Sequence, residues 1–244
     1  MPPTLSMVIV SWNVCTLLER ALASAYASWG SAPGLEVIVV DNASGDGTVA
    51  MIREKFPQVH LVSNAENRGF TRGNNQGIDR ATGDLLFLLN PDTEVLGDAL
   101  HTLVAYAEDH PEVGVIGPQL LNPDGSVQSS RRHFPTPAVL CFESTWLEAL
   151  LPRYTLKHYY AQEKPDDAVQ PVDWVVGAAM VVRREVVEQV GAFDEGFFMY
   201  SEELDWCRRI KAAGWEVVYD PQARIVHYEG KSSEQVVQIG RAHV

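Results

Sequence analysis

Apolar residues along the chain form short unbroken runs that alternate with amphipathic stretches. The runs predict strands at 5–12, 36–40, 59–63 and 84–89. The stretches that follow them predict helices at 14–28, 46–56, 70–81 and 96–109. An unbroken apolar run is typical of a strand buried on both faces of a parallel sheet, and helices between such strands favour right-handed β-α-β units. The first half is therefore predicted to be an α/β layer structure.

The regular alternation of predicted strands and helices ends at residue 112. We expect a strand at 113–121, a turn at 122–125 (NPDG), helices at 178–190 and 202–213, and strands at 216–219 and 224–228. The segment 133–172 holds five prolines and many aromatic residues, and its pattern predicts no regular element. Since no repeat or low-complexity linker interrupts the chain, we expect one domain over 1–238, with halves at 1–112 and 113–238.

Charge and cysteine content narrow the function classes. The 244 residues carry 32 acidic and 19 basic side chains, a net charge of −13, which argues against nucleic acid as a partner and against general attraction to anionic lipid. An acidic protein that binds an anionic nucleotide needs a local cation. Three widely spaced cysteines suggest a reducing compartment. The start lacks the pattern of a signal peptide, and the apolar run 174–182 is too short to span a bilayer, so a cytoplasmic location is expected.

One strand ends in a polar tip that could hold a cation. The run LLFLL at 85–89 leads into Asn90, Pro91 and Asp92, and Pro91 cannot donate to a sheet. Ligands of open α/β sheets bind at the carboxyl ends of the strands, where a carboxylate can hold a divalent cation and through it a diphosphate. The alternative is that Asp92 is a turn residue or a helix cap.

Two further segments have a nucleotide-binding and a plainer interpretation. Asp41, in VVDNAS, ends the second strand, where a carboxylate can accept hydrogen bonds from a ribose or a base; a turn is the alternative. In ENRGFTRGNNQGI, Gly69 allows close backbone approach and Asn67 and Asn74 add polar groups, but an ordinary helix start explains the same residues.

The third acidic segment lies at the start of the helix at 202–213. Glu202 and Glu203 stand in its first turn with Asp205, where the helix dipole alone would favour acids. Neighbouring aromatics (Phe197, Phe198, Tyr200 and Trp206) could raise a carboxyl pKa toward the range of a general base. His227 ends the last strand and, with a carboxylate, could complete a site for Mg²⁺ or Mn²⁺.

The ordered set VIVSWN, VVDNAS, NRGFTRGNNQGI, LLFLLNPDT, GAAMVVRREVVEQVGAFDEGFFMYSEELDWCRR and HYEG resembles the inverting GT-A-fold glycosyltransferases of family 2, and within them the rhamnosyltransferase-like bacterial branch. The resemblance covers about residues 5–231. It implies a Rossmann-like, mostly parallel sheet flanked by helices, with a C-terminal acceptor-side part. It also implies a role in cell-wall or polysaccharide biosynthesis.

The resemblance assigns roles to the candidate residues. Asp41 would contact the base or ribose of a UDP- or dTDP-linked sugar, and Asn67, Gly69 and Asn74 would line the nucleotide pocket. Asn90 and Asp92 occupy the family's metal-binding D-x-D motif, with His227 as a further ligand of Mg²⁺ or Mn²⁺. Glu203 would be the general base beside Glu202. The sequence departs from the family in having Asn90 at the first D-x-D position and Glu203 where relatives more often have Asp.

The resemblance also implies the partners: a donor sugar, with rhamnose expected, and a glycan, glycolipid or small-molecule acceptor. Arg131 and Arg132 face either a substrate phosphate or solvent. A sugar-phosphate nucleotidylyltransferase is an alternative, but the loop after the first strand lacks its Gly-rich, Arg-containing pattern. A non-catalytic sugar-nucleotide-binding homologue is the other. The ending IGRAHV at 239–244 departs from the preceding pattern, and we expect it to be a non-native tail that replaces residues able to contact the inner face of the membrane.

Overall fold

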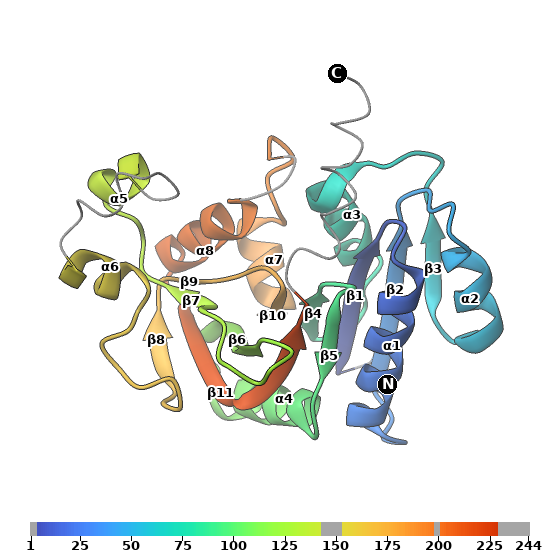
Figure 1. Ribbon diagram of the computed structural model, residues 1–244, viewed down its shortest axis with the longest axis horizontal. Coiled ribbons are helices and arrows are strands. Elements are labelled where there is room, and N and C mark those ends of the chain that lie inside the picture. Colours follow the sequence, from blue (N-terminus) through green and yellow to red (C-terminus); the bar gives the residue numbers. More distant parts are fainter. Residues whose placement is uncertain (1–3, 143–152, 198–200, 229–244) are drawn as a thin grey trace.

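The computed structural model describes residues 4–142, 153–197 and 201–228, which form a central sheet with helices on both faces (Figure 1). The sheet has nine strands in the order β3-β2-β1-β4-β10-β6-β11-β5, with β8 also paired to β11. The strands of this sheet are β1 (Leu5–Ser11), β2 (Leu35–Asp41), β3 (His60–Ser63), β4 (Leu85–Leu89), β5 (Thr93–Val95), β6 (Val113–Leu121), β8 (Gln170–Val172), β10 (Ala179–Arg183) and β11 (Glu216–His227). A separate small sheet pairs β7 (Arg131–Arg132) with β9 (Trp174–Val175).

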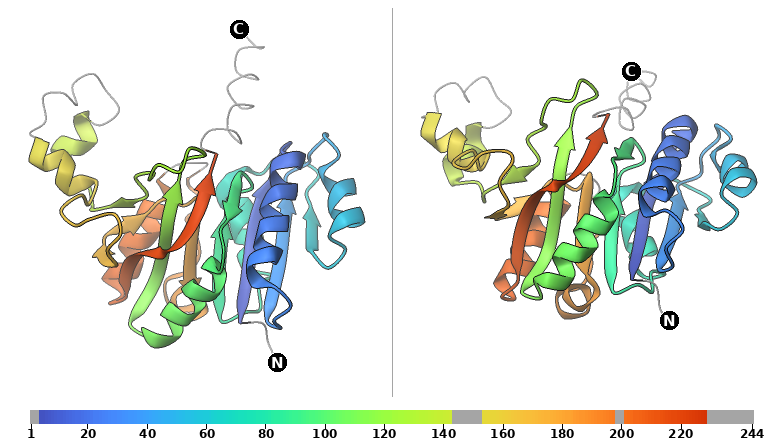
Figure 2. Two further views of the ribbon diagram at one scale, coloured as in Figure 1. Left: turned by 60° about the horizontal axis from the view of Figure 1, so that its bottom comes forward. Right: turned by 90° about the horizontal axis from the view of Figure 1, so that it is seen from below.

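Eight helices lie among the described residues. They are α1 (Cys15–Trp29), α2 (Thr48–Lys55), α3 (Gly69–Ile78), α4 (Ala99–Asp109), α5 (Pro137–Phe142), α6 (Arg153–Tyr159), α7 (Arg184–Val190) and α8 (Glu202–Ala212). Helices α1, α2 and α4 cover one face of the sheet, where Leu18, Met51 and Leu103 join its core. Helices α3, α7 and α8 cover the other face through Ile78, Val186 and Ile210, giving three layers (Figure 2).

The first half of the chain has the predicted β-α-β architecture. Strands β1, β2, β3 and β4 pair in parallel, and each of the predicted helices between them is present. The run Leu85–Leu89 is buried along its whole length, as expected for a strand covered on both faces. The mostly parallel α/β prediction is therefore confirmed.

The prediction of a helix at 178–190 is wrong for its first part. Residues Ala179–Arg183 form β10, which lies antiparallel between β4 and β6, and only Arg184–Val190 are helical. The apolar residues of this segment suit either a helix face or a buried strand by spacing alone. The position between β4 and β6 favours a strand, because the segment there must be apolar on both faces and must complete the backbone hydrogen bonds of both neighbouring strands.

Two details at the other end of the sheet also differ from expectation. The predicted strands 216–219 and 224–228 are one strand, β11, whose register against β6 shifts between Asp220 and Arg224. Residues Thr93–Val95 form β5, antiparallel to β11, and α4 begins only at Ala99, so Asp92 does not cap a helix. A bulge in β11 explains the broken pattern, because the extra residues interrupt its alternation.

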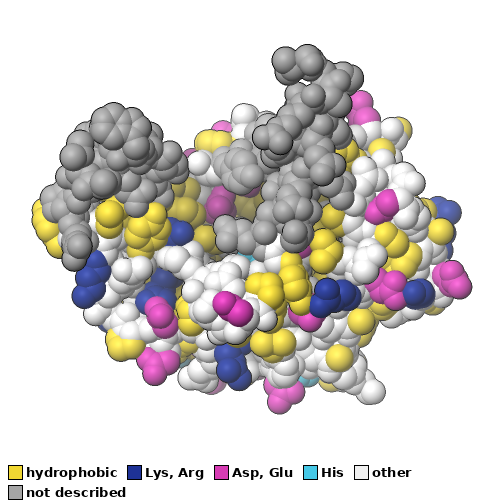
Figure 3. Space-filling model, in the orientation of Figure 1, with side chains coloured by type: hydrophobic (Ala, Val, Ile, Leu, Met, Phe, Trp, Pro, Cys, Tyr) yellow, Lys and Arg dark blue, Asp and Glu magenta, His cyan; other side chains and the backbone are white. Residues whose placement is uncertain are grey.

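The segment that the sequence left unassigned forms α5, α6 and β8, at the far side of β11 from β1 (Figure 1). Phe198, Tyr200 and the tail 239–244 lie outside the described residues. On the face seen in Figure 3, Lys and Arg side chains lie apart from one another, among acidic and apolar ones. No helix in the described part of the chain combines the length and apolar character needed to cross a membrane.

Candidate active site

The carboxyl edge of the sheet gathers several of the predicted residues. Strands β2, β4 and β11 run in the same direction, so Asp41, the Asn90–Asp92 tip and His227 all come at this edge. Strand β5 folds the tip back along β11, because Thr93 is the register partner of His227. The amide of Tyr228 donates to the carbonyl oxygen of Asp92 at 2.9 Å. The chain therefore fixes Asp92 and His227 next to each other through its backbone.

Asp92 and His227 form a buried pair. Their exposed fractions are 1% and 8%, and Oδ1 of Asp92 lies 3.6 Å from Nε2 of His227. Two ligands that each lie about 2.1 Å from one ion are at most about 4.2 Å apart, so this separation fits a shared divalent cation. A carboxylate with an imidazole is a donor set that Mn²⁺ accepts. The residues present therefore fit the divalent metal that the sequence predicts.

Gln128 contacts the other side of the His227 ring and was missed by the sequence analysis. Its Oε1 lies 3.0 Å from Nδ1 of His227, and its Nε2 donates to the backbone oxygen of the same residue at 2.8 Å. The predicted turn at 122–125 is present and holds Gln128 in place, because Nε2 also donates to Oδ1 of Asn122 at 2.8 Å. No local motif marks Gln128, because this contact joins residues 99 positions apart.

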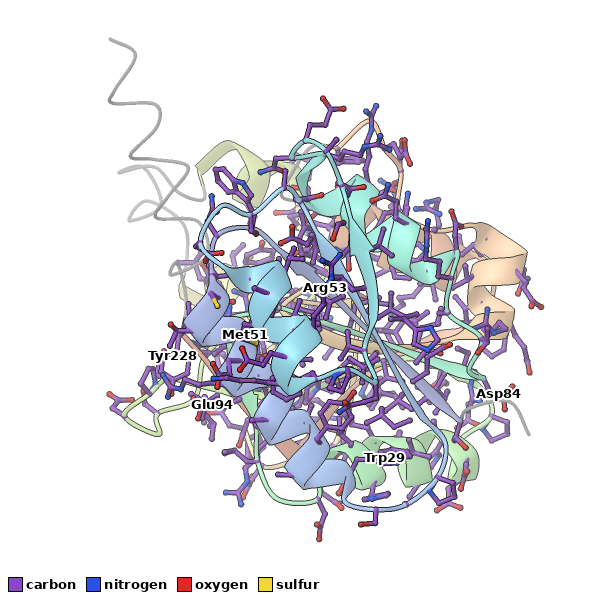
Figure 4. All side chains as sticks on the ribbon, turned by 90° about the vertical axis from the view of Figure 1, so that its right-hand side faces the viewer. Trp29, Met51, Arg53, Asp84, Glu94 and Tyr228 are labelled. Atoms are coloured by element: carbon purple, nitrogen blue, oxygen red, sulfur yellow. The ribbon has the colours of Figure 1, made fainter. Side chains whose placement is uncertain are left out.

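Tyr228 fastens the end of β11 to the first helix. Its hydroxyl accepts a hydrogen bond from Nη2 of Arg20 at 2.7 Å and donates to Oε1 of Glu94 at 3.0 Å. Glu94 and Tyr228 lie beside each other in Figure 4. Arg20 also forms an ion pair with Glu94. This cluster limits how far β5 and β11 can separate around Asp92 and His227.

Asp41 presents a buried carboxylate at the neighbouring strand end. Oδ2 accepts from the amide of Ser44 at 3.0 Å, while Oδ1 has no hydrogen-bond partner among the described residues. Ser11 is the register partner of Asp41 on β1, and its buried hydroxyl also has no hydrogen-bond partner within the described ranges. A buried polar atom of this kind costs free energy unless a ligand or water bonds to it. Ser11 carries no motif and was missed from the sequence.

The start of α3 lies against Asp41. The side chain of Asn42 donates to the carbonyl oxygen of Gly69 at 3.1 Å, which ties the end of β2 to this helix. Gly69 has φ of +81°, a conformation that suits glycine, and its amide donates to Oδ1 of Asn67 at 2.9 Å. Asn74 is buried and donates to the carbonyl oxygen of Phe70 within its own helix. A helix therefore starts here as predicted, at Gly69, and the side chain of Asn67 bonds the amide of its first residue.

Glu202 and Glu203 lie in the first turn of α8. Burial, with the charge of Glu203 next to it, raises the pKa of Glu202 to about 7. Burial also raises the pKa of Glu203, although the amide of Gly177 and the charge of Arg132 act against it. Each carboxyl has one oxygen, Oε2, that is buried and without a hydrogen-bond partner among the described residues. The helix dipole favours the ionised forms of both acids, but the loss of water on burial outweighs it and raises both pKa values.

The other acid of this turn has a structural contact, and one of the expected aromatic residues belongs to the core. Asp205 pairs with Nε of Arg209 one helical turn later, at 2.8 Å. Trp206 is fully buried and donates from Nε1 to the carbonyl oxygen of Gly191, so it belongs to the core. That Trp206 also borders the carboxylates stays a prediction. Cys207 and Ile210 of the same helix lie in the core cluster that contains Trp206.

The two adjacent arginines have different settings. Arg131 is 3% exposed and donates to the carbonyl oxygens of Ala161 and Lys164 and to Oδ1 of Asp166, so it holds the 161–166 loop. Arg132 lies over the ring of Tyr160, 4.6 Å from its centroid, on the side where its charge reaches Glu203. Only Arg132 therefore faces the candidate active site.

A second group of metal-type side chains lacks a coordinating geometry. His133, His158 and Glu163 lie close together near the end of α6. The two imidazole rings stack, with centroids 4.5 Å apart and planes 16° apart. Ring nitrogens coordinate in the plane of the ring, so two stacked rings do not direct their lone pairs at one ion. Asp92 and His227 remain the better cation site.

Comparison with known proteins agrees with this arrangement. The model of the family described as glycosyl transferase family 2 matches residues 6–191. An N-acetylglucosaminyl-diphospho-decaprenol L-rhamnosyltransferase of Mycobacterium tuberculosis is 32% identical over 244 residues, which is 96% of this chain and 78% of the relative. The low-salt glycan biosynthesis hexosyltransferase Agl10 of Haloferax volcanii is 29% identical over 182 residues, covering 72% of this chain and 53% of the relative.

Two solved structures share the fold. The mannosyltransferase PcManGT from Pyrobaculum calidifontis, in complex with GDP-Man and Mn²⁺, has a TM-score of 0.67 at 22% identity. The match covers 99% of this chain and 61% of that structure's chain. GalNAc-T7 with UDP, GalNAc and Mn²⁺ has a TM-score of 0.70 at 18% identity, covering 92% of this chain and 43% of that one. At these identities the likeness concerns the fold alone.

Proposed function

The chain belongs to glycosyltransferase family 2, and from that premise we propose that it transfers a sugar from a nucleoside diphosphate to an acceptor hydroxyl with inversion at the anomeric carbon. One observation carries the proposal: the sheet edge holds two separate acidic centres, the Asp92–His227 pair and the Glu202–Glu203 pair. The residues that precede β10 connect them. Ala178 accepts a hydrogen bond from the amide of Asn90 at 2.8 Å, and Gly177 lies against the side chain of Glu203.

The first centre serves the donor diphosphate. Asp92 and His227 would hold Mg²⁺ or Mn²⁺, which when bound neutralises charge on the departing nucleoside diphosphate. Asp92 is the carboxylate that the tip offers, since Asn90 replaces the first acid of the family's motif. Asn90 orients the tip through its backbone, donating to Ala178 and accepting from the hydroxyl of Thr93 at 2.7 Å.

The nucleotide binds at the ends of β1 and β2. The unpartnered Oδ1 of Asp41 would accept a hydrogen bond from the ribose or the base, beside the buried hydroxyl of Ser11. The start of α3, with Asn67 and Gly69, offers backbone amides near the phosphates, and Asn74 supports the helix behind them. All of these residues lie within 1–112, which we propose is the donor-binding half of a single domain.

The second centre performs the proton transfer. The carboxylate of Glu203 takes the proton of the acceptor hydroxyl while that oxygen forms a bond to the anomeric carbon. The bond from this carbon to the diphosphate oxygen breaks, and its electron pair leaves with the nucleoside diphosphate. Burial raises the pKa of Glu203, which strengthens it as a base once ionised, and Glu202 adds a second negative charge beside it. One displacement gives inversion.

The relatives guide the choice of substrates. The mycobacterial relative is by name an L-rhamnosyltransferase that acts on a sugar joined to decaprenol through a diphosphate. We therefore propose rhamnose, carried on dTDP or UDP, as the donor sugar. We propose a lipid-linked glycan at the inner face of the membrane as the acceptor. The charge of Arg132 acts on Glu203, so we propose that Arg132 binds the phosphate of this acceptor.

Binding and transfer assays test the proposal. Titration calorimetry with dTDP-rhamnose, UDP-sugars and free nucleotides, each with and without Mn²⁺, should show metal-dependent binding that Asp92→Ala removes. The matched control is Asp84→Ala, because Asp84 is an exposed acid at the opposite end of β4 (Figure 4). Product analysis should show transfer with inversion. Binding that needs neither metal nor Asp92 would contradict the metal role, and retention of configuration would contradict the single displacement.

A further inference from the structure

We infer that Gln128 fixes the tautomer of His227 and thereby keeps Nε2 available as a metal ligand. The inference rests on the proposed metal site and deepens it. Gln128 bonds Nδ1 of the imidazole, whereas Asp92 lies near Nε2, and within the described ranges its side-chain hydrogen bonds go to His227 and Asn122. It is therefore a positioning residue, which acts through His227.

The orientation of the Gln128 amide follows from its partners. One end of this amide lies 2.8 Å from the backbone carbonyl oxygen of His227. A carbonyl oxygen can only accept, so the amide end that faces it must be the NH₂ group. The same NH₂ group reaches Oδ1 of Asn122, whose own NH₂ donates to the hydroxyl of Ser126 at 2.8 Å. The opposite orientation would bring oxygen against oxygen at both contacts.

The tautomer of His227 follows from that orientation. The carbonyl oxygen Oε1 of Gln128 faces Nδ1 of His227 at 3.0 Å and can only accept. Nδ1 must therefore carry the proton, and in the neutral ring Nε2 then carries the lone pair. Nε2 lies 3.6 Å from Oδ1 of Asp92, so two atoms that each offer an electron pair lie next to each other. This arrangement suits a cation between them. In metal sites generally, the histidine nitrogen that does not bind the metal usually donates a hydrogen bond to a neighbouring group, as Nδ1 does here.

Without Gln128, the site would favour the wrong tautomer. Asp92 is a buried acceptor close to Nε2, so it would stabilise a proton on that nitrogen. A protonated Nε2 cannot coordinate a metal. The Gln128 carbonyl therefore opposes the pull of Asp92 and keeps the metal-binding nitrogen free of its proton before any ligand arrives.

The test reads the tautomer directly. Long-range ¹H–¹⁵N NMR spectra of histidine-labelled protein, with His227→Ala to assign the signal, should show Nδ1–H in the wild type. Gln128→Leu should move the proton to Nε2 and weaken Mn²⁺ binding about 10–100-fold. The control Gln222→Leu changes an exposed glutamine on β11, the strand of His227, and should alter neither the tautomer nor the Mn²⁺ affinity.

The outcomes separate this inference from the proposed function. A wild-type His227 protonated at Nε2, or a Gln128→Leu variant that keeps the proton on Nδ1, would overturn the role of Gln128. Unchanged Mn²⁺ binding in His227→Ala would instead overturn the metal site. The wild-type spectrum keeps the inference testable even if Gln128→Leu fails to fold.

Discussion

Replacing Glu202 with glutamine should make the protein more stable at alkaline pH. Glu202 is 4% exposed, and burial together with the charge of Glu203 raises its pKa to about 7 from an ordinary 4.5. A carboxyl with a raised pKa stays protonated in the folded protein over a range where the unfolded chain has already lost its proton. Stability therefore falls as the pH rises from about 4.5 to about 7, and the loss is complete above that range.

The size of the effect follows from the same values. At about 1.4 kcal/mol per pH unit, a pKa raised from 4.5 to about 7 corresponds to roughly 3 kcal/mol of folding free energy. Glu202→Gln removes this penalty and also removes one charge from beside Glu203. The variant should therefore gain up to about 3 kcal/mol relative to wild type between pH 4.5 and pH 8.

Urea denaturation followed by circular dichroism at these two pH values measures the effect. Comparing the two differences removes any constant cost of the altered side chain. Glu185→Gln changes an exposed acid in the first turn of α7 and controls for the loss of one charge at a helix start. A difference between Glu202→Gln and wild type that is equal at both pH values would refute the assignment of Glu202 as a buried carboxyl with a raised pKa.

Three further predictions concern catalysis and folding. Glu203→Gln should lower the transfer rate by about 10²–10⁴-fold with nucleotide affinity preserved, measured by product formation and calorimetry; near-normal transfer would exclude Glu203 as the base. Because burial raises the pKa of Glu203, the wild-type rate should fall as the pH drops, starting above the ordinary pH range of a carboxyl group. Glu202→Gln should move that decline to lower pH in a pH–rate profile, and an unmoved decline would show that the two acids are independent. Arg131→Ala should lower the free energy of unfolding by about 1–3 kcal/mol, since the carbonyl oxygens of Ala161 and Lys164 lose their donor. Arg132→Ala should cost less stability and more transfer activity, and the reverse order would contradict their separate roles.

The sequence predicts best where burial leaves one solution. The run at 85–89 had to be a strand covered on both faces, and its polar end had to lie at the ligand-binding edge. Residues 179–183 were harder, because their apolar spacing suits a helix face as well as a central strand. The gap between β4 and β6 selects the strand, and that gap is invisible until the sheet is assembled.

The site divides in the same way. Asp41, Asp92 and Glu203 follow recognisable local patterns and were predicted. Gln128 depends on a contact with His227 across 99 positions, and no local pattern encodes it. Trp206 illustrates a related limit: the structure buries it fully, but the spacing of a helical residue in the sequence does not show which neighbours cover it.

The contact between Tyr228 and Asp92 has a practical consequence for handling the protein. The amide of Tyr228 is bonded to the backbone of Asp92, so whatever follows Tyr228 in the chain departs from beside the proposed metal ligand. Leu5 begins β1 at the opposite, amino end of that strand (Figure 1). Affinity tags, fluorophores and surface-immobilisation linkers therefore belong at the start of the chain. The same groups attached just after Tyr228 would pull on Asp92 and distort any measured metal or donor affinity.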